Sequence, residues 1–234
     1  MSAFIRYQIT SFIRSMTFIP PAVIFFAWIF ILYAYKNVPI LSSYGVSSIA
    51  LYLCMTWITM AIFQLEEESE KHILFTHLNG KVEYIIGKWL AALISMLPLV
   101  SFAIIFPLAT SSFNGDMTFG LLAMTFYSHI SFALFGIIVG TLFSATTLAL
   151  KKYAWLSAVF VLVVSLASKS LLETFAPLKW ILWIVPPIFR VIDNMGDLDL
   201  IILEKAIFVD GIIVFIYIVI FSGLAMLLFL KRER

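Results

Sequence analysis

Long, unbroken runs of hydrophobic residues alternate with short polar stretches, and six of the runs are long enough to cross a membrane. A helix needs about 20 mainly apolar residues to span the hydrocarbon layer. The runs cover residues 18–35, 44–65, 89–112, 117–150, 153–172 and 211–230. A transmembrane β-barrel would show short alternating segments instead. The pattern predicts an all-α, polytopic membrane protein with six transmembrane helices, forming a single transmembrane domain over residues 1–234.

Composition narrows the function further. The chain has 234 residues, of which 63% are hydrophobic and 12% charged, whereas an ordinary globular chain is about 45–50% apolar and about 25% charged. A soluble enzyme, a nucleic-acid-binding protein and a disordered tail are excluded on these grounds. The single cysteine, Cys54, lies inside an apolar run, which excludes an internal disulfide framework and a cysteine metal cluster.

The basic residues predict the orientation. An even number of spans places both termini on one side, with ten of the fifteen Lys and Arg residues on that side and five on the other. The ten are Arg6, Arg14, Lys71, Lys81, Lys88, Lys151, Lys152, Lys231, Arg232 and Arg234; the five are Lys36, Lys169, Lys179, Arg190 and Lys205. By the positive-inside rule, both termini are expected in the cytoplasm, with the chain in the cell membrane.

Residues 3–16 precede the first apolar run and have an amphipathic pattern. On a helical wheel one face carries Ile5, Ile9, Phe12, Ile13 and Met16. Arg6 and Arg14 lie beside this face, where they can reach lipid phosphate. The pattern predicts a helix in the membrane interface. Two roles stay open for it: an elbow helix that feeds the first span, or a surface anchor.

The segment 66–88, between the second and third runs, is the most informative part of the expected cytoplasmic side. Glutamates open it, and Asn79-Gly80 is a helix stop because both residues tolerate the left-handed conformation. A short helix is therefore expected at about Glu68–Leu78. Its apolar residues, among them Phe75, favour burial in a groove of another protein; the alternative is a loop that packs against its own bundle.

Residues 173–205, on the expected outer side, contain an apolar stretch that is too short to cross. Trp180 and Trp183 lie in this stretch, and Pro186-Pro187 interrupts it. We expect a re-entrant or interfacial pair of helices, which membranes tolerate where the pair packs against protein or a cavity. These four residues are candidates for a gate. The alternative is an aromatic belt that only positions the bundle.

Within the spans, His129 is the residue most suggestive of function, together with Tyr127 and Ser131. An intramembrane ionisable residue is a candidate for a transport pathway; the alternative is a neutral histidine bonded to a neighbouring helix. Gly136 and Gly140 permit a close helix contact, either within the bundle or in a dimer. Apart from His129 and residues at the ends, the spans lack charged residues, which argues against an ion-coupled carrier.

No catalytic, metal or cofactor site is predicted in this chain. His72 and His77 are five residues apart, which puts them about 140° apart on a helix, so they do not form a zinc pair. Gly80 and Gly87-Lys88 faintly resemble a phosphate-binding loop. However, six residues rather than four separate the glycines, and Trp89 stands where a magnesium ligand is needed.

Taken together, the arrangement resembles the permease subunit of ABC-2 type transporters. The resemblance covers nearly the whole chain: an elbow helix, six spans, a cytoplasmic helix between the second and third, and a re-entrant hairpin before the last. It includes a local pattern of a Glu-rich entry at residues 66–70, a short coupling helix, the turn Asn79-Gly80, and Gly87-Lys88 before the third span. The turn lacks the proline that is frequent in the family.

The resemblance implies half of an ATP-driven exporter, and its likeness to compact bacterial permeases implies a bacterial source. Two copies of the chain would pair as a homodimer on two separate ATPase subunits, which supply ATP and Mg. The cargo would be hydrophobic or amphipathic, with an antimicrobial or toxin-like peptide favoured over a drug or lipid. A membrane scaffold or sensor that transports nothing is the alternative. The residues that contact the ATPase would be Glu68, Lys71, His72, Phe75, Thr76, Leu78, Asn79 and Gly80.

Overall fold

The computed structural model describes the whole chain except residues 149, 175–176, 178–181, 197–204 and 234. The described residues form helices and no strand, with one isolated bridge between Val38 and Phe113. The helices are α1 (Ser2–Arg14), α2 (Ile19–Leu32), α3 (Ile40–Phe63), α4 (Glu68–His77), α5 (Lys81–Ala109), α6 (Phe119–Ala145), the 3-10 turn η1 (Lys151–Tyr153), α7 (Ala154–Thr174), α9 (Ile188–Ile192) and α10 (Lys205–Arg232). The predicted all-α class is confirmed.

Five of these helices are long and apolar enough to cross a membrane: α3, α5, α6, α7 and residues 207–232 of α10. The chain is therefore a multi-pass membrane protein. The remaining predicted span, 18–35, differs, because its helix α2 has 14 residues and is only about 21 Å long. It reaches spanning length only together with α1, and the two helices are bent by 77° where they meet.

Three helices, α3, α5 and α10, begin before the hydrophobic runs that predicted them. Hydropathy marks only the apolar part of a helix, whereas backbone hydrogen bonding continues through polar residues at its ends. Helix α5 begins at Lys81, directly after the Asn79-Gly80 helix stop, and continues through the third run to Ala109. Helix α3 likewise begins at Ile40 and α10 at Lys205, whereas α6 ends at Ala145, inside the run 117–150.

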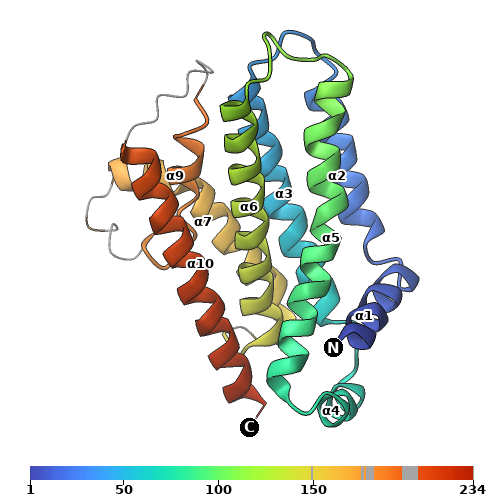
Figure 1. Ribbon diagram of the computed structural model, residues 1–234. Helices are drawn as coiled ribbons and strands as arrows, with labels where there is room; N and C mark the ends of the chain where they lie inside the picture. Colours follow the sequence, from blue (N-terminus) through green and yellow to red (C-terminus); the bar gives the residue numbers. More distant parts are fainter. Residues whose placement is uncertain (149, 175–176, 178–181, 197–204, 234) are drawn as a thin grey trace.

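The centre of the bundle is the pair α3 and α6, which run side by side in the same direction (Figure 1) and are the most deeply buried of the spanning helices. Gly136 and Gly140 make this contact close. A Cβ atom at Gly136 would lie 2.8 Å from the carbonyl oxygen of Tyr52, and one at Gly140 would lie 2.8 Å from that of Thr56. The glycine pair therefore forms a helix contact within the bundle, which is one of the two predicted alternatives.

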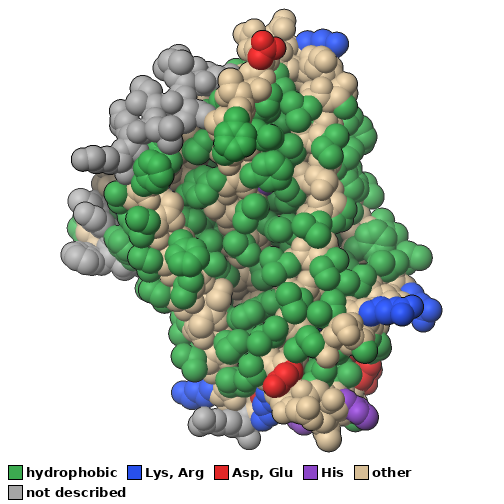
Figure 2. All heavy atoms as spheres, in the orientation of Figure 1, with side chains coloured by type: hydrophobic (Ala, Val, Ile, Leu, Met, Phe, Trp, Pro, Cys, Tyr) green, Lys and Arg blue, Asp and Glu red, His purple; other side chains and the backbone are tan. Residues whose placement is uncertain are grey.

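The outer helices α7 and α10 present hydrophobic side chains to their surroundings. In Figure 2 hydrophobic side chains cover most of the visible face between the two ends, while the charged ones gather mainly at the ends. This distribution fits a protein surrounded by lipid over its middle. Both termini lie at the same end, close to α1 and α4 (Figure 1).

Gly140→Ala is expected to destabilise the protein by about 1–3 kcal/mol, because the added methyl group meets the α3 backbone and the core cannot expand without strain. The measurement is equilibrium unfolding of the purified protein in detergent micelles. Gly223→Ala is the matched control, since no atom lies within 4 Å of its Cβ position. An equal response of the two variants would show that close α3–α6 packing contributes nothing to stability.

Candidate functional site

Helix α4 lies across the end of the bundle that holds both termini (Figure 1). Glutamates in its first turn, Glu68 and Glu70, favour its start because carboxylates stabilise the positive end of the helix dipole. The helix ends at His77, and Asn79 follows with a φ of 63°. This left-handed turn reverses the chain, so that α5 begins only two residues later at Lys81.

The inner face of α4 packs against its own bundle through aromatic side chains. Phe75 is buried, and its ring centroid lies 5.0 Å from that of Tyr84 on α5 and 6.2 Å from that of Phe229 on α10. Tyr84 and Phe229 stack with their centroids 6.0 Å apart. The apolar surface of Phe75, expected to need a partner's groove, is therefore covered by the chain itself.

Charged residues fasten α4 to the last turn of α10. Lys71 pairs with Glu233, and Arg232 lies 3.6 Å from Glu68. Lys81 Nζ donates a hydrogen bond of 2.5 Å to the main-chain oxygen of Glu233. We call these five residues the C-terminal clasp. They join the beginning of α4 and of α5 to the end of α10, three elements that are distant in sequence.

A buried ion pair joins α5 to the end of α3. Lys88 pairs with Glu66, and their side chains are only 0% and 2% exposed. Lys88 Nζ also donates a hydrogen bond of 2.6 Å to the carbonyl oxygen of Ile62. Glu66 accepts further hydrogen bonds from Gln8 on α1 and, at 3.0 Å, from the Tyr84 hydroxyl. A buried charge is tolerated only when it is paired and hydrogen-bonded in this way.

Sequence reasoning missed this pair. The sequence placed Lys88 at the end of the cytoplasmic segment 66–88. In the structure α5 begins at Lys81, so Lys88 lies two turns inside a helix. The signal available was the apolar stretch Tyr84–Ile86 before Lys88, which continues the third run toward the N-terminus.

Helix α1 packs on the bundle through one face and exposes the rest. Phe4, Gln8 and Phe12 are buried, whereas Arg6 and Arg14 are exposed. The predicted apolar face is therefore divided: Phe12 contacts protein, while Ile13 and Met16 are exposed. Tyr7 donates a hydrogen bond to Glu70, which joins α1 directly to α4.

The outer face of α4 is exposed in the described part of the structure. Of the predicted contact residues, Glu68, His72, Thr76 and Asn79 are exposed, Lys71, Leu78 and Gly80 are partly buried, and Phe75 is buried. Ile73, which lies beside His72, is 59% exposed. The surface available to a partner is thus centred on His72, Ile73 and Thr76, which we call the α4 outer face.

A pocket of about 530 Å³ adjoins the inner side of α4. Both charged and apolar residues line it, including Glu66, Glu68, Lys71, Phe229 and Arg232. Its opposite wall is the end of α6, where Arg232 Nη1 donates a hydrogen bond of 3.2 Å to the carbonyl oxygen of Ser144. The clasp and the buried ion pair therefore border the same space.

The pathway candidates lie in the core of the bundle. His129 has no exposed surface; its Nδ1 donates a hydrogen bond of 2.8 Å to the carbonyl oxygen of Thr125, and its Nε2 lies 2.9 Å from the Ser47 hydroxyl on α3. Ser131 is buried. The Tyr127 hydroxyl is buried and has no hydrogen-bond partner among the residues that the structure describes. Of the two interpretations of His129, the structure therefore fits a histidine that is hydrogen-bonded to a neighbouring helix, here α3.

The gate candidates are described in part, because Trp180 lies outside the described residues. Trp183 is 55% exposed and Pro186 is buried. Pro187 is the N-cap of the short helix α9, so the two prolines do interrupt the helical structure. Among the described residues no group of three or more His, Cys, Asp or Glu side chains is placed to hold a metal ion.

Comparison with known proteins adds no assignment. The chain matches no protein family, and no curated protein or solved structure is significantly similar to it.

Lys88→Met is expected to destabilise the protein by about 3–5 kcal/mol, because it leaves the Glu66 carboxylate buried without its counter-charge. The double variant Lys88→Met, Glu66→Gln removes both charges and is expected to recover most of this loss. Equilibrium unfolding in detergent micelles measures both. Asp193→Asn breaks the exposed Lys169–Asp193 pair as a control and is expected to change little. A double variant no more stable than the single one would contradict this assignment.

Phe229→Ala is expected to loosen α4 while the centre of the bundle stays folded, since Phe229 covers Phe75 and Tyr84. Amide hydrogen exchange over residues 68–77 should accelerate by about tenfold or more, because exchange reports the local opening free energy. Residues 121–140 of α6 serve as the internal reference. Leu227→Ala on the same helix is the matched control, as Leu227 is 67% exposed. Unchanged exchange over 68–77 would show that α10 does not hold α4.

Proposed function

We propose that the chain is the membrane-spanning permease subunit of an ATP-driven exporter of the ABC-2 type. In this proposal two copies pair, and each binds a separate ATPase subunit that supplies ATP and Mg. The observation that carries the proposal is α4: a short helix at one end of the bundle, anchored on its inner face and open on its outer face. An exposed isoleucine with polar neighbours suits contact with another protein.

The anchoring of α4 supports a mechanical role. A force applied to a loosely tethered loop would be lost in local motion, whereas α4 contacts α1 through Glu70, α5 through Phe75 and α10 through the C-terminal clasp. Displacement of α4 by a partner is therefore opposed at three helices at once. A helix anchored in this way can transmit movement to the bundle, because tightly packed helices shift as rigid bodies rather than deform.

The cargo in this proposal is hydrophobic or amphipathic, with an antimicrobial or toxin-like peptide favoured over a drug or lipid. The central helices α3 and α6 contain no Asp, Glu, Lys or Arg, and the buried Lys88–Glu66 pair lies at the α4 end, which argues against an ion-coupled carrier. The excess of Lys and Arg at the end with both termini supports placing that end in the cytoplasm of a bacterial cell.

Ile73→Asp tests the proposal. The cognate ATP-binding subunit is identified by co-purification with the wild-type permease, and the ATP hydrolysis rate of the complex is then measured in lipid nanodiscs. The charge placed on the α4 outer face should weaken the complex by about tenfold or more, since burial of an isoleucine side chain is lost. Phe75→Asp is unsuitable because Phe75 is buried in its own chain.

Leu148→Asp is the matched control. Leu148 is 54% exposed, compared with 59% for Ile73, and it lies in the α6–α7 connection rather than on α4. Its complex and its ATPase rate should stay close to those of the wild type. If no ATP-binding subunit associates with the wild-type chain, or if cargo never changes the ATPase rate, the scaffold or sensor alternative is the better description.

A further inference from the structure

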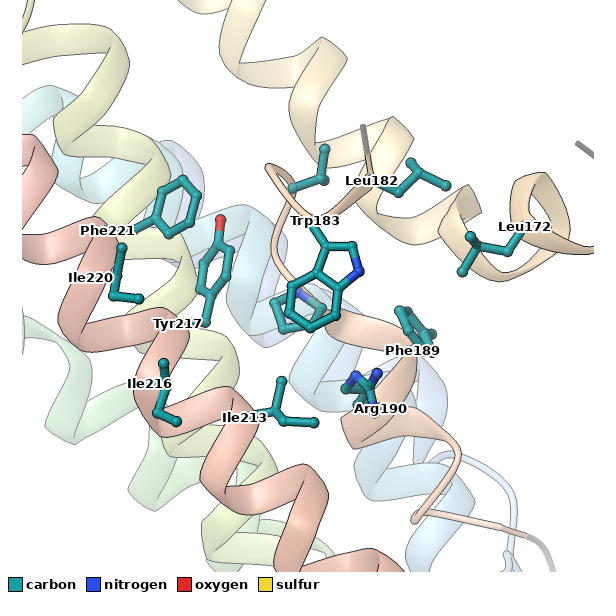
Figure 3. Close-up of a pocket in the computed structure, with 12 residues that line it drawn as sticks. Leu172, Leu182, Trp183, Phe189, Arg190, Ile213, Ile216, Tyr217, Ile220 and Phe221 are labelled. Atoms are coloured by element: carbon teal, nitrogen blue, oxygen red, sulfur yellow. The ribbon is translucent and has the colours of Figure 1, made fainter. Parts of the chain in front are cut away.

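An apolar pocket of about 590 Å³ lies between α10 and the segment that contains α9. Figure 3 shows Ile213, Ile216 and Tyr217 along the α10 wall, with Trp183 and Phe189 on the other side. The Tyr217 hydroxyl donates a hydrogen bond of 3.2 Å to the carbonyl oxygen of Ile184, which holds the two walls together. The volume falls within the range of pockets that bind small molecules.

One end of this pocket is polar. Arg190, which lines it, forms an ion pair of 2.6 Å with Asp210 at the beginning of α10. The side chains are 27% and 19% exposed, so both charges stay partly accessible. Asn194 donates a hydrogen bond to the main-chain oxygen of Arg190 at 2.7 Å, which fixes the backbone there. A charged end thus adjoins an apolar interior.

The dimensions of the pocket match one leaflet of a bilayer. From Asp210 to Phe221, α10 advances about 16 Å, which is close to half of the roughly 30 Å hydrocarbon thickness. Side chains of α10 around the pocket face outward: Phe215 is 66% exposed and Ile220 58%. In a multi-pass membrane protein this surface lies against lipid, so the pocket opens toward the acyl chains of the leaflet farther from the termini.

We propose that this pocket binds one membrane phospholipid whose head group carries both an ammonium and a phosphate. Its acyl chain lies along Ile213, Ile216 and Tyr217, and its head group lies at the Arg190–Asp210 pair. The charge pattern selects this occupant, because Arg190 complements the phosphate and Asp210 the ammonium. An anionic lipid without the ammonium would meet the Asp210 carboxylate unfavourably. This proposal depends only on the membrane location and is independent of the exporter assignment.

Photo-crosslinking tests the tail site. The full chain is reconstituted in nanodiscs that contain phosphatidylethanolamine with a diazirine near the end of one acyl chain, and labelled peptides are mapped by mass spectrometry. Label should concentrate on residues 182–190 and 213–221. Ile216→Trp fills the pocket and should reduce this label by about tenfold, since contacts with at least two methylene groups are lost. Val219→Trp is the matched control, as Val219 is exposed on α10 outside the pocket, and should leave the label unchanged.

A second probe tests the head-group site. Diazirine-tailed phosphatidylglycerol, which lacks the ammonium, should label the wild type less than phosphatidylethanolamine does. Asp210→Asn removes the repelling carboxylate and leaves Arg190 positive, so the preference should reverse. Equal labelling in Ile216→Trp and Val219→Trp, or label spread evenly along α10, would overturn the proposal in favour of ordinary bilayer contact. Efficient crosslinking of two copies of the chain through Ile216→Cys, with no lipid label, would overturn it in favour of a dimer interface.

Discussion

The close approach of α3 and α6 is the contact around which the other helices are arranged. Apolar side chains gain little by leaving lipid for one another, so helices in a membrane associate through close packing and hydrogen bonds. Gly136 and Gly140 bring the α6 backbone against that of α3, and polar side chains join the two helices above this contact. His129 reaches Ser47, and Ser48 bonds to Ser128 at 3.1 Å. Small residues and short polar bonds therefore do here what hydrophobic burial does in a soluble protein.

At the end of the bundle with both termini, a different set of forces holds the structure together. Lys88 and Glu66 would each be costly to bury alone, and their pairing makes the position tolerable without making it strongly favourable. What the pair contributes is connection: through Gln8, Ile62 and Tyr84 it joins α1, α3 and α5. The C-terminal clasp then adds α4 and α10. Ion pairs and hydrogen bonds thus join five helices, α1, α3, α4, α5 and α10, at this end. The middle of the bundle is held together by close packing instead.

Much of the architecture follows from hydropathy, while the local chemistry does not. The apolar runs predict five of the spanning helices, because residues such as those of α3 and α10 have no stable exposed alternative in water. Lys88 was expected in the cytoplasmic segment 66–88, because a buried lysine looks like a flank residue until its partner Glu66 is known. Phe75 was expected to face a partner for the same reason: its cover, Phe229, lies far away in the sequence. Pairings of this kind depend on the three-dimensional path of the chain, which local patterns do not contain.

The clasp also sets an order of events during biosynthesis. Lys71 meets its partner Glu233 across 162 residues, so α4 leaves the ribosome long before the residue that secures it exists. Until α10 has been made and inserted, Phe75 lacks its contact with Phe229, and Lys71 lacks its partner Glu233. The α4 outer face can therefore adopt its final position only after α10 has been made.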